Sequence, residues 1–171
     1  RRTQSYSDLF TPGLNNALQL YVTNSLDNHP VWKQLSNRST AWFSRCSCPY
    51  SYGQHITVQA QVFPPWLNEL TNAVTKALHL KEPPNCCNVN WYKDGSQGVG
   101  VHADDEKLFR ADNVLIVSLS LGAERSFKIV PNDRSCDGMD IQLPAGSILS
   151  MAGRMQNHYR HALPTGVGNH T

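Results

Sequence analysis

The sequence predicts a mainly β protein, with a double-sheet β core and helices near the N-terminus. Short apolar runs rich in β-branched residues follow one another from Cys86 onward, and clusters of Gly, Pro, Asn and Asp separate them. Helical spacing of apolar residues is found only before that point. Strands of this length and spacing are typical of sandwiches and barrels. We therefore expect two packed sheets supported by N-terminal helices.

Two helices are expected before the strands. Beyond the break at Pro12, apolar residues recur at helical spacing from Leu14 to Val22, and a polar turn follows at Asp27. A second helix begins at Pro64-Pro65 and is closed by the stretch "KEPP". Its apolar stripe, which we expect to face the core, consists of Trp66, Leu67, Leu70, Val74, Ala77 and Leu78.

The expected strands lie between turn signals in the second half of the chain. They are "CNVNWY", "GVGVHAD", "VLIVSLSL", "SFKIV", "DIQLP", "SILSM" and "HYRHALP". No linker, internal repeat or low-complexity tract interrupts the sequence, so residues 1–171 are expected to form a single domain.

Composition narrows the classes of protein. A chain of 171 residues with 40% hydrophobic and 16% charged residues can bury a full core. A net charge of +2 permits a nucleic-acid partner without requiring one. No run of eighteen apolar residues is present, and the start "RRTQSYSDLF" has no apolar stretch that could serve as a signal peptide. We therefore expect a soluble intracellular protein, nuclear or cytoplasmic, without a membrane partner, and we expect it to be a monomer. The five cysteines lack C-x2-C spacing, and we expect free thiols.

The stretch "GVGVHADDE" contains a candidate metal site. Strand alternation puts His102 and Asp104 on the same face, because side chains two apart point the same way. A third ligand is available in "NHYRHALP", where His158 and His161 are both candidates. Two histidines and one carboxylate form the facial triad that holds Fe(II) and leaves coordination positions open. This pattern points toward oxygenase chemistry.

A family resemblance extends from about Arg38 to Pro164. The stretch "NWYKDGSQGVGVHADDE" resembles the signature of the AlkB-type dioxygenases, nearest to the branch of the animal DNA-repair homologues and their bacterial relatives. Further blocks resemble the family in the same order: "RSTAWF", "PYSYG", "PPWLNEL", "VSLSLGAERSF", "PAGSILSMAG" and "HYRHALP". The resemblance implies a jelly-roll, or double-stranded β-helix, with Fe(II) and 2-oxoglutarate as cofactors.

The resemblance also implies an activity and a ligand set. The expected reaction is oxidative demethylation of N-alkylated bases such as 1-methyladenine or 3-methylcytosine in DNA or RNA, with release of formaldehyde, succinate and CO2. His102, Asp104 and His161 are expected to hold the metal, which leaves His158 outside the triad. Asn90 and Tyr92 match the family's N-x-Y pair, whose side chains hydrogen-bond 2-oxoglutarate.

Substrate-binding residues follow from the same resemblance and from the chemistry of a base. A flipped base needs an aromatic platform, and Tyr52, with Tyr50 nearby, matches the family's position. Glu106 can accept a hydrogen bond from an exocyclic amino group, and Asp105 can orient a loop. The remaining candidates are Arg38, at a position that approaches the substrate, and Arg125, whose guanidinium can pair with a carboxylate or phosphate.

The sequence differs from the family pattern in one respect and leaves two alternative functions open. The family carries arginines beyond the third ligand, one of which clamps 2-oxoglutarate, whereas no arginine follows Arg160 here. We expect that clamp on a strand beyond Thr171. The alternatives to a nucleic-acid demethylase are a dioxygenase of the same family acting on protein or a small molecule, and a non-catalytic nucleic-acid-binding module.

Overall fold

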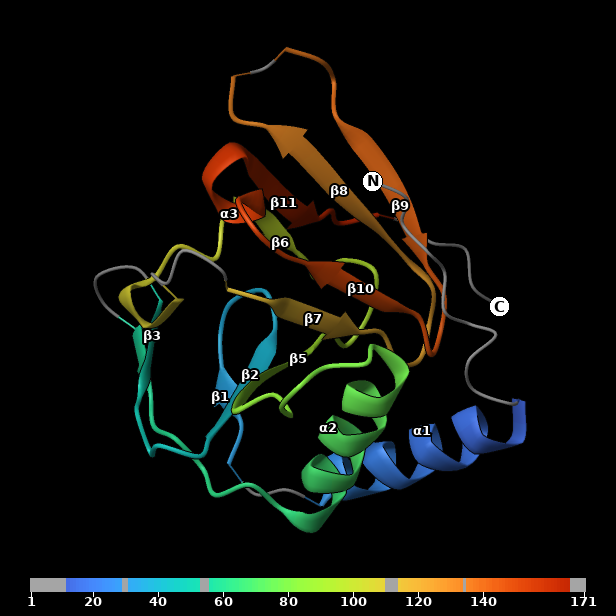
Figure 1. The fold of residues 1–171 in the computed structure, drawn as a ribbon. Helices are drawn as coiled ribbons and strands as arrows, with labels where there is room; N and C mark the ends of the chain where they lie inside the picture. Colours follow the sequence, from blue (N-terminus) through green and yellow to red (C-terminus); the bar gives the residue numbers. More distant parts are fainter. Residues whose placement is uncertain (1–11, 29–30, 53–55, 110–113, 134, 167–171) are drawn as a thin grey trace. The chain divides into compact units, whose positions relative to one another are not determined.

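The computed structural model describes residues 12–28, 31–52, 56–109, 114–133 and 135–166. The protein is mainly β, as predicted (Figure 1). Its chain divides into two compact units. We call Leu9–Trp91 the N-terminal unit and Tyr92–Thr171 the C-terminal unit. No helix among the described residues is long and apolar enough to span a lipid bilayer.

The N-terminal unit combines two helices with short antiparallel sheets. Strand β2 lies between β1 and β5 in one sheet, and β3 pairs with β4 in another. Both predicted helices are confirmed, and the second begins at Pro65, where its missing N–H costs nothing. The elements are α1 (Pro12–Asp27), β1 (Lys33–Gln34), β2 (Ser39–Ser44), β3 (Tyr50–Tyr52), β4 (Ile56–Val58), α2 (Pro65–Ala77) and β5 (Cys86–Trp91).

Strand β2 forms the centre of the N-terminal unit and is buried along its whole length. Trp42 stacks on Tyr50, with ring centroids 4.8 Å apart, and its indole N–H donates to the carbonyl of Cys48 at 2.7 Å. On the next residue, Phe43 meets Trp66 of α2 edge to face at 5.6 Å. Because side chains alternate along a strand, both faces of β2 are covered by aromatic rings.

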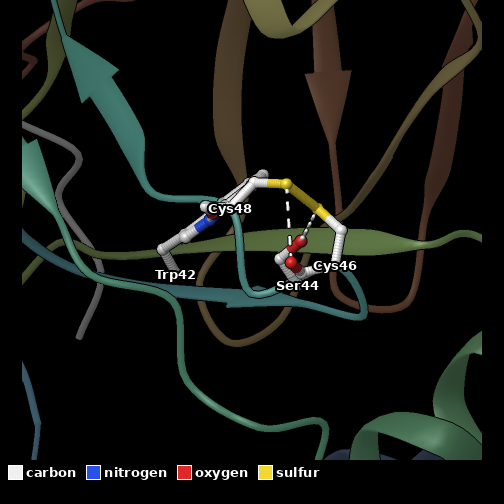
Figure 2. Close-up of a disulfide and its surroundings, with 4 residues drawn as sticks. All are labelled: Trp42, Ser44, Cys46 and Cys48. Carbon is white, nitrogen blue, oxygen red and sulfur yellow. Dashed lines mark hydrogen bonds between the residues drawn. A yellow bond between two sulfur atoms is a disulfide. The ribbon is translucent and has the colours of Figure 1, made fainter.

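The cysteines differ in part from the expectation. Cys46 and Cys48 form a disulfide in the turn after β2, so the prediction of free thiols is wrong for this pair (Figure 2). The turn brings their Cα atoms to 5.2 Å, within the range that disulfides span. Cys86, Cys87 and Cys136 are free. Burial, and then the neighbouring Cys86, raises the pKa of the Cys87 thiol to about 12, which keeps it protonated and unreactive.

The C-terminal unit is the double-stranded β-helix. Its four-stranded sheet has the order β6-β11-β8-β9, and β10 pairs with β7 in a second sheet. All of the strands predicted from Cys86 onward are confirmed. The elements are β6 (Val99–His102), a 3-10 turn η1 (Lys107–Phe109), β7 (Ile116–Leu119), β8 (Arg125–Pro131), β9 (Met139–Leu143), β10 (Ile148–Met151), α3 (Met155–His158) and β11 (Tyr159–Leu163).

An apolar cluster joins the two sheets of the C-terminal unit. Both sheets contribute side chains to it, so their inner faces pack together as in other jelly rolls. Its buried members are Phe127, Ile129, Leu143, Leu149 and Met151, with Ile116, Ile141 and Met155 packed against them.

Gly98, immediately before β6, allows this segment to approach the end of β11. A Cβ built at this position overlaps the carbonyl oxygen of Leu163, whereas one at Gly100 meets no atom within 4 Å. Gly98→Ala is expected to destabilise the protein by about 1–3 kcal/mol, the usual cost of forcing extra atoms into a packed site. Gly100→Ala, two residues further along and within β6, is the matched control. Urea denaturation of the two variants tests this, and equal stabilities would contradict it.

Candidate active site

Two histidines meet on neighbouring strands of the four-stranded sheet. His102 ends β6 and His161 lies in β11, and the two are direct partners in the antiparallel register. Their ring centroids are 4.3 Å apart. Residues that are 59 positions apart in the chain thus become neighbours through one rung of the ladder. The sheet alone determines this half of the site.

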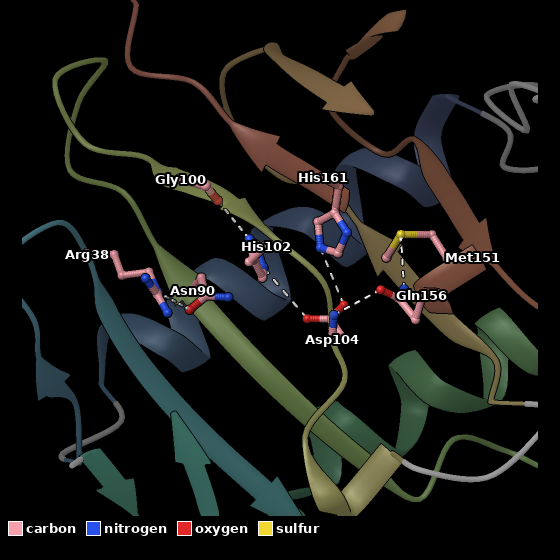
Figure 3. Close-up of polar contacts among 8 residues, drawn as sticks. All are labelled: Arg38, Asn90, Gly100, His102, Asp104, Met151, Gln156 and His161. Carbon is pink, nitrogen blue, oxygen red and sulfur yellow. Dashed lines mark hydrogen bonds and ion pairs between the residues drawn. The ribbon is translucent and has the colours of Figure 1, made fainter. Parts of the chain in front are cut away.

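Asp104 completes the cluster from the loop after β6. One carboxylate oxygen lies 3.7 Å from His102 Nε2 and the other lies 3.4 Å from His161 Nε2. Figure 3 shows the three side chains turned toward one another. The expected reason for this placement is wrong, because β6 ends at His102 and strand alternation does not extend to Asp104. The loop instead carries the carboxylate to the histidines.

Hydrogen bonding and burial prepare both rings for a metal. The Nδ1 atom of His102 lies 2.8 Å from the carbonyl of Gly100, and since a carbonyl only accepts, Nδ1 carries the proton. In the neutral His102 ring the lone pair is therefore on Nε2, which faces Asp104. Burial, and then repulsion from the neighbouring His102 ring when that ring carries a proton, lowers the pKa of His161 to about 4, so the His161 ring is neutral at neutral pH. Metals bind neutral imidazole.

The surroundings of His161 and Asp104 also fit a cation. The His161 ring is only 5% exposed and stacks on Phe127 at 5.3 Å. Desolvation raises the pKa of Asp104; His102 opposes this rise and Asp105 adds to it. A divalent ion within the cluster would offset this desolvation of the carboxylate. The three donor atoms lie within 4.8 Å of one another, with two nitrogens and one carboxylate oxygen, the donor set of non-haem Fe(II).

Asn90 and Arg38 are bound to each other in the N-terminal unit. The Nε of Arg38 donates to Oδ1 of Asn90 at 2.8 Å, from a side chain that is buried. Because Arg only donates, this contact fixes the Asn90 amide with its oxygen toward Arg38 and its NH2 group pointing away. Neighbouring Thr40 likewise binds Asn88 at 2.8 Å across the same strand pair. The sequence predicted Arg38 and Asn90 as site residues, but it did not predict the hydrogen bond between them.

Tyr92 and Arg125 come together in the C-terminal unit. The Arg125 guanidinium lies over the Tyr92 ring, 5.7 Å from its centroid. It also donates to the backbone carbonyls of Gln97 and Pro164, at 2.8 and 3.0 Å. These bonds join the segment before β6 to the segment after β11. Arg125 therefore supports the two strands that bear the histidines, a role that the sequence did not indicate.

The other predicted residues fall in different environments. Tyr50 is 3% exposed and stacked on Trp42, so its ring belongs to the core of the N-terminal unit. Tyr52 ends β3 opposite Ile56, and its side chain lies outside the described part of the chain. Asp105 is exposed and Glu106 is half-buried, immediately before η1. His158, the alternative third ligand, ends α3 with an exposed side chain, apart from the triad.

Two residues near the triad were not anticipated. Phe127 covers the His161 ring, and Gln156 accepts the backbone N–H of Asp104 at 2.9 Å. Phe127 reads as an ordinary core residue in the sequence. Gln156 is 52 positions from Asp104, and nothing in the local pattern connects the two. Only the tertiary fold reveals these contacts.

A double-stranded β-helix with a His, Asp and His triad is the architecture of a mononuclear iron oxygenase. The chain belongs to the 2OG-Fe(II) oxygenase superfamily, whose profile matches residues 14–168. The cofactors of this family are Fe(II) and 2-oxoglutarate, as expected. Within the superfamily the chain is AlkB-like, which its similarity to curated relatives and to a solved structure supports.

Three curated relatives illustrate that similarity. Alpha-ketoglutarate-dependent dioxygenase alkB homolog 3 of Mus musculus is 31% identical over 136 residues, 74% of this chain and 46% of that protein. DNA oxidative demethylase ALKBH2 of Mus musculus is 37% identical over 83 residues, which are 44% of this chain and 34% of that protein. The RNA-directed RNA polymerase of Lolium latent virus (isolate Lolium/USA/US1/-) is 32% identical over 130 residues, 75% of this chain and 7% of that protein. The chain thus spans less than half the length of each.

A solved structure agrees on the fold. The structure of OsALKBH1 superposes with a TM-score of 0.64, covering 96% of this chain and 88% of that one. The sequence identity is 15%, so this likeness concerns the fold alone.

Proposed function

We propose that the protein is a nucleic-acid demethylase that removes N-alkyl groups from bases in DNA or RNA. The observation that carries the proposal is the cluster of His102, Asp104 and His161 on a jelly roll, where the His161 ring is neutral and the desolvated Asp104 carboxylate would gain from a bound cation. Support for the substrate class comes from two relatives, of which one is named a DNA oxidative demethylase. 1-Methyladenine and 3-methylcytosine are the proposed lesions.

The proposed mechanism assigns the cofactors to named side chains. His102, Asp104 and His161 hold Fe(II), and Asn90 and Tyr92 hydrogen-bond 2-oxoglutarate. Arg38 assists by keeping the oxygen of the Asn90 amide, which leaves the NH2 group to donate to an anionic carboxylate. When bound, Fe(II) and 2-oxoglutarate with dioxygen supply the oxidation of an N-methyl group, which leaves as formaldehyde with succinate and CO2 as coproducts.

The substrate reaches such a site only outside a base stack. A paired base is inaccessible to a buried reaction centre, so the target nucleotide is flipped out or taken from a single strand. We assign Tyr52 to stack on that base and Glu106 to accept a hydrogen bond from its exocyclic amino group. Asp105, exposed beside Asp104, is assigned to orient the loop. Arg125 acts through the backbone bonds described above.

Turnover on defined substrates tests the proposal. The protein is incubated with Fe(II), 2-oxoglutarate and matched DNA and RNA oligonucleotides that contain 1-methyladenine or 3-methylcytosine, and repaired base and succinate are measured by mass. We expect the wild type to repair the methylated base and the Asp104→Ala variant not to repair it. Succinate without repair on any oligonucleotide would overturn the substrate class in favour of a protein or a small molecule. Lack of succinate under all conditions would indicate a non-catalytic module.

Replacement of Tyr52 tests the base platform. Tyr52→Ala is expected to weaken binding of a methylated oligonucleotide by about 1–3 kcal/mol, the worth of one stacked base. Tyr52→Phe keeps the π-face and is expected to bind like the wild type. Fluorescence anisotropy measures both affinities. Equal weakening by Phe and Ala would show that the ring does not act by stacking.

A further inference from the structure

The loop that carries Asp104 is held by a side chain from a distant element. After β6 ends at His102, Asp104 is outside the ladder that places the two histidines. Its backbone N–H donates to Oε1 of Gln156 at 2.9 Å, and Gln156 lies in α3, 52 positions away. A backbone bond next to the carboxylate restricts where that carboxylate can point. The position of Asp104 therefore depends on a contact outside the sheet.

The orientation of the Gln156 amide is determined by its partners. An N–H can only donate, so the atom facing Asp104 is the amide oxygen. The NH2 group then faces the opposite way, where it lies 3.7 Å from the sulfur of Met151 (Figure 3). Met151 is 4% exposed and belongs to the apolar cluster of the C-terminal unit. Gln156 thus connects the Asp104 loop to the core.

The helix that carries Gln156 is itself anchored. Asn132 donates from its backbone to the carbonyl of His158 at 2.8 Å and from its side chain to the carbonyl of Asn157 at 2.9 Å. These two bonds attach α3 to the end of β8. Since α3 continues directly into β11, Gln156 has a fixed position relative to His161, which follows five residues later.

We propose that Gln156 is a positioning residue that holds Asp104 between His102 and His161 and so sets the affinity and geometry of the metal site. Gln156 is not a member of the triad, and its contact is with the backbone of Asp104. It acts through the backbone of a ligand, as outer-shell partners do in other metal sites. The proposal concerns the triad and is independent of which substrate is oxidised, so a different substrate would leave it intact.

Metal binding without turnover tests the proposal. Co(II), whose visible absorption reports the coordination geometry, is titrated anaerobically into the wild type and the variants. Gln156→Leu keeps an apolar side chain at this position but removes the acceptor, and is expected to raise the Kd for Co(II) by about 10–100-fold, the usual effect of losing an outer-shell partner. The spectrum of the bound ion is expected to change as well, since Asp104 is no longer fixed.

Two further variants separate positioning from general stability. Gln156→Glu keeps an oxygen for the Asp104 N–H and is expected to recover most of the affinity and the wild-type spectrum. Asn157→Leu, an exposed side chain on the same helix, is the matched control and is expected to bind Co(II) normally. Wild-type affinity and spectrum in Gln156→Leu would overturn the proposal, as would equal losses in Gln156→Leu and Asn157→Leu. If Gln156→Leu does not fold, Gln156→Asn, which is one methylene too short to reach, is judged by the same two outcomes.

Discussion

His161→Ala is expected to abolish Fe(II)-dependent turnover of 2-oxoglutarate while His158→Ala leaves it largely intact. His161 is buried against Phe127, lies 3.4 Å from Asp104 and faces His102 across the sheet. His158 ends α3 with an exposed side chain and is not in the cluster. His158 and His161 are three positions apart. Comparing the two variants therefore distinguishes a metal ligand from a nearby histidine that does not bind the metal.

The size of the expected loss of metal affinity depends on whether a ligand or a supporting residue is removed. Changes in residues that merely support a ligand cost about 10–100-fold in metal affinity, and loss of one of three ligands is expected to exceed that range. His102→Ala and Asp104→Ala are expected to behave like His161→Ala. Succinate formation and calorimetric titration with Mn(II) are measured on each variant. Loss of metal binding in His158→Ala, with binding retained in His161→Ala, would show that the third ligand is assigned wrongly.

Trp42→Ala is expected to reduce the free energy of unfolding by about 3–5 kcal/mol, the cost of deleting a large buried ring. Trp42 is 1% exposed, stacks on Tyr50 and donates to the carbonyl of Cys48. Its removal leaves both a cavity and a carbonyl without its donor, and these two costs act in the same direction. We therefore expect this to be the largest single effect on stability among the substitutions considered.

Trp91→Ala is the control for the same residue type on the same sheet. Trp91 is 53% exposed and makes only a tilted contact with Trp32 at 6.1 Å between centroids, so its loss is expected to cost far less. Trp42→Phe is expected to fall between the two, since it keeps a ring but not the indole N–H. Urea denaturation followed by circular dichroism measures all three. Similar losses for Trp42→Ala and Trp91→Ala would contradict the assignment of Trp42 to the core.

The sequence was most informative where the apolar pattern matched one kind of element. The Pro64-Pro65 start and the apolar stripe predicted α2, and turn residues separated the strands from β5 to β11. Strand β2 was not predicted, because it is buried on both faces and so lacks alternation of polar and apolar residues. The short strands β1, β3 and β4 were also missed, since two or three residues carry too little periodicity to detect.

The candidate site was predictable in its ligands but not in its support. The motif identified His102, Asp104 and His161 as the ligands. The reason given for pairing His102 with Asp104, strand alternation, was wrong because β6 ends at His102. The contacts of Gln156 with Asp104 and of Arg125 with two carbonyls depend on packing between segments far apart in sequence. A single sequence does not encode such pairings in any local pattern.

The direct pairing of His102 with His161 has a consequence for how the chain tolerates change. Both residues are placed by one rung between β6 and β11, and the hairpins between them do not determine their separation. Insertions and deletions in the turn between β8 and β9 are therefore expected to leave the two rings in place, provided that Asn132 keeps α3 attached. A one-residue slip of β11 would instead turn His161 to the opposite face of the sheet. Length variation is thus permitted at the turns and forbidden within two short strands, which lets the surface around the site diversify without loss of the metal ligands.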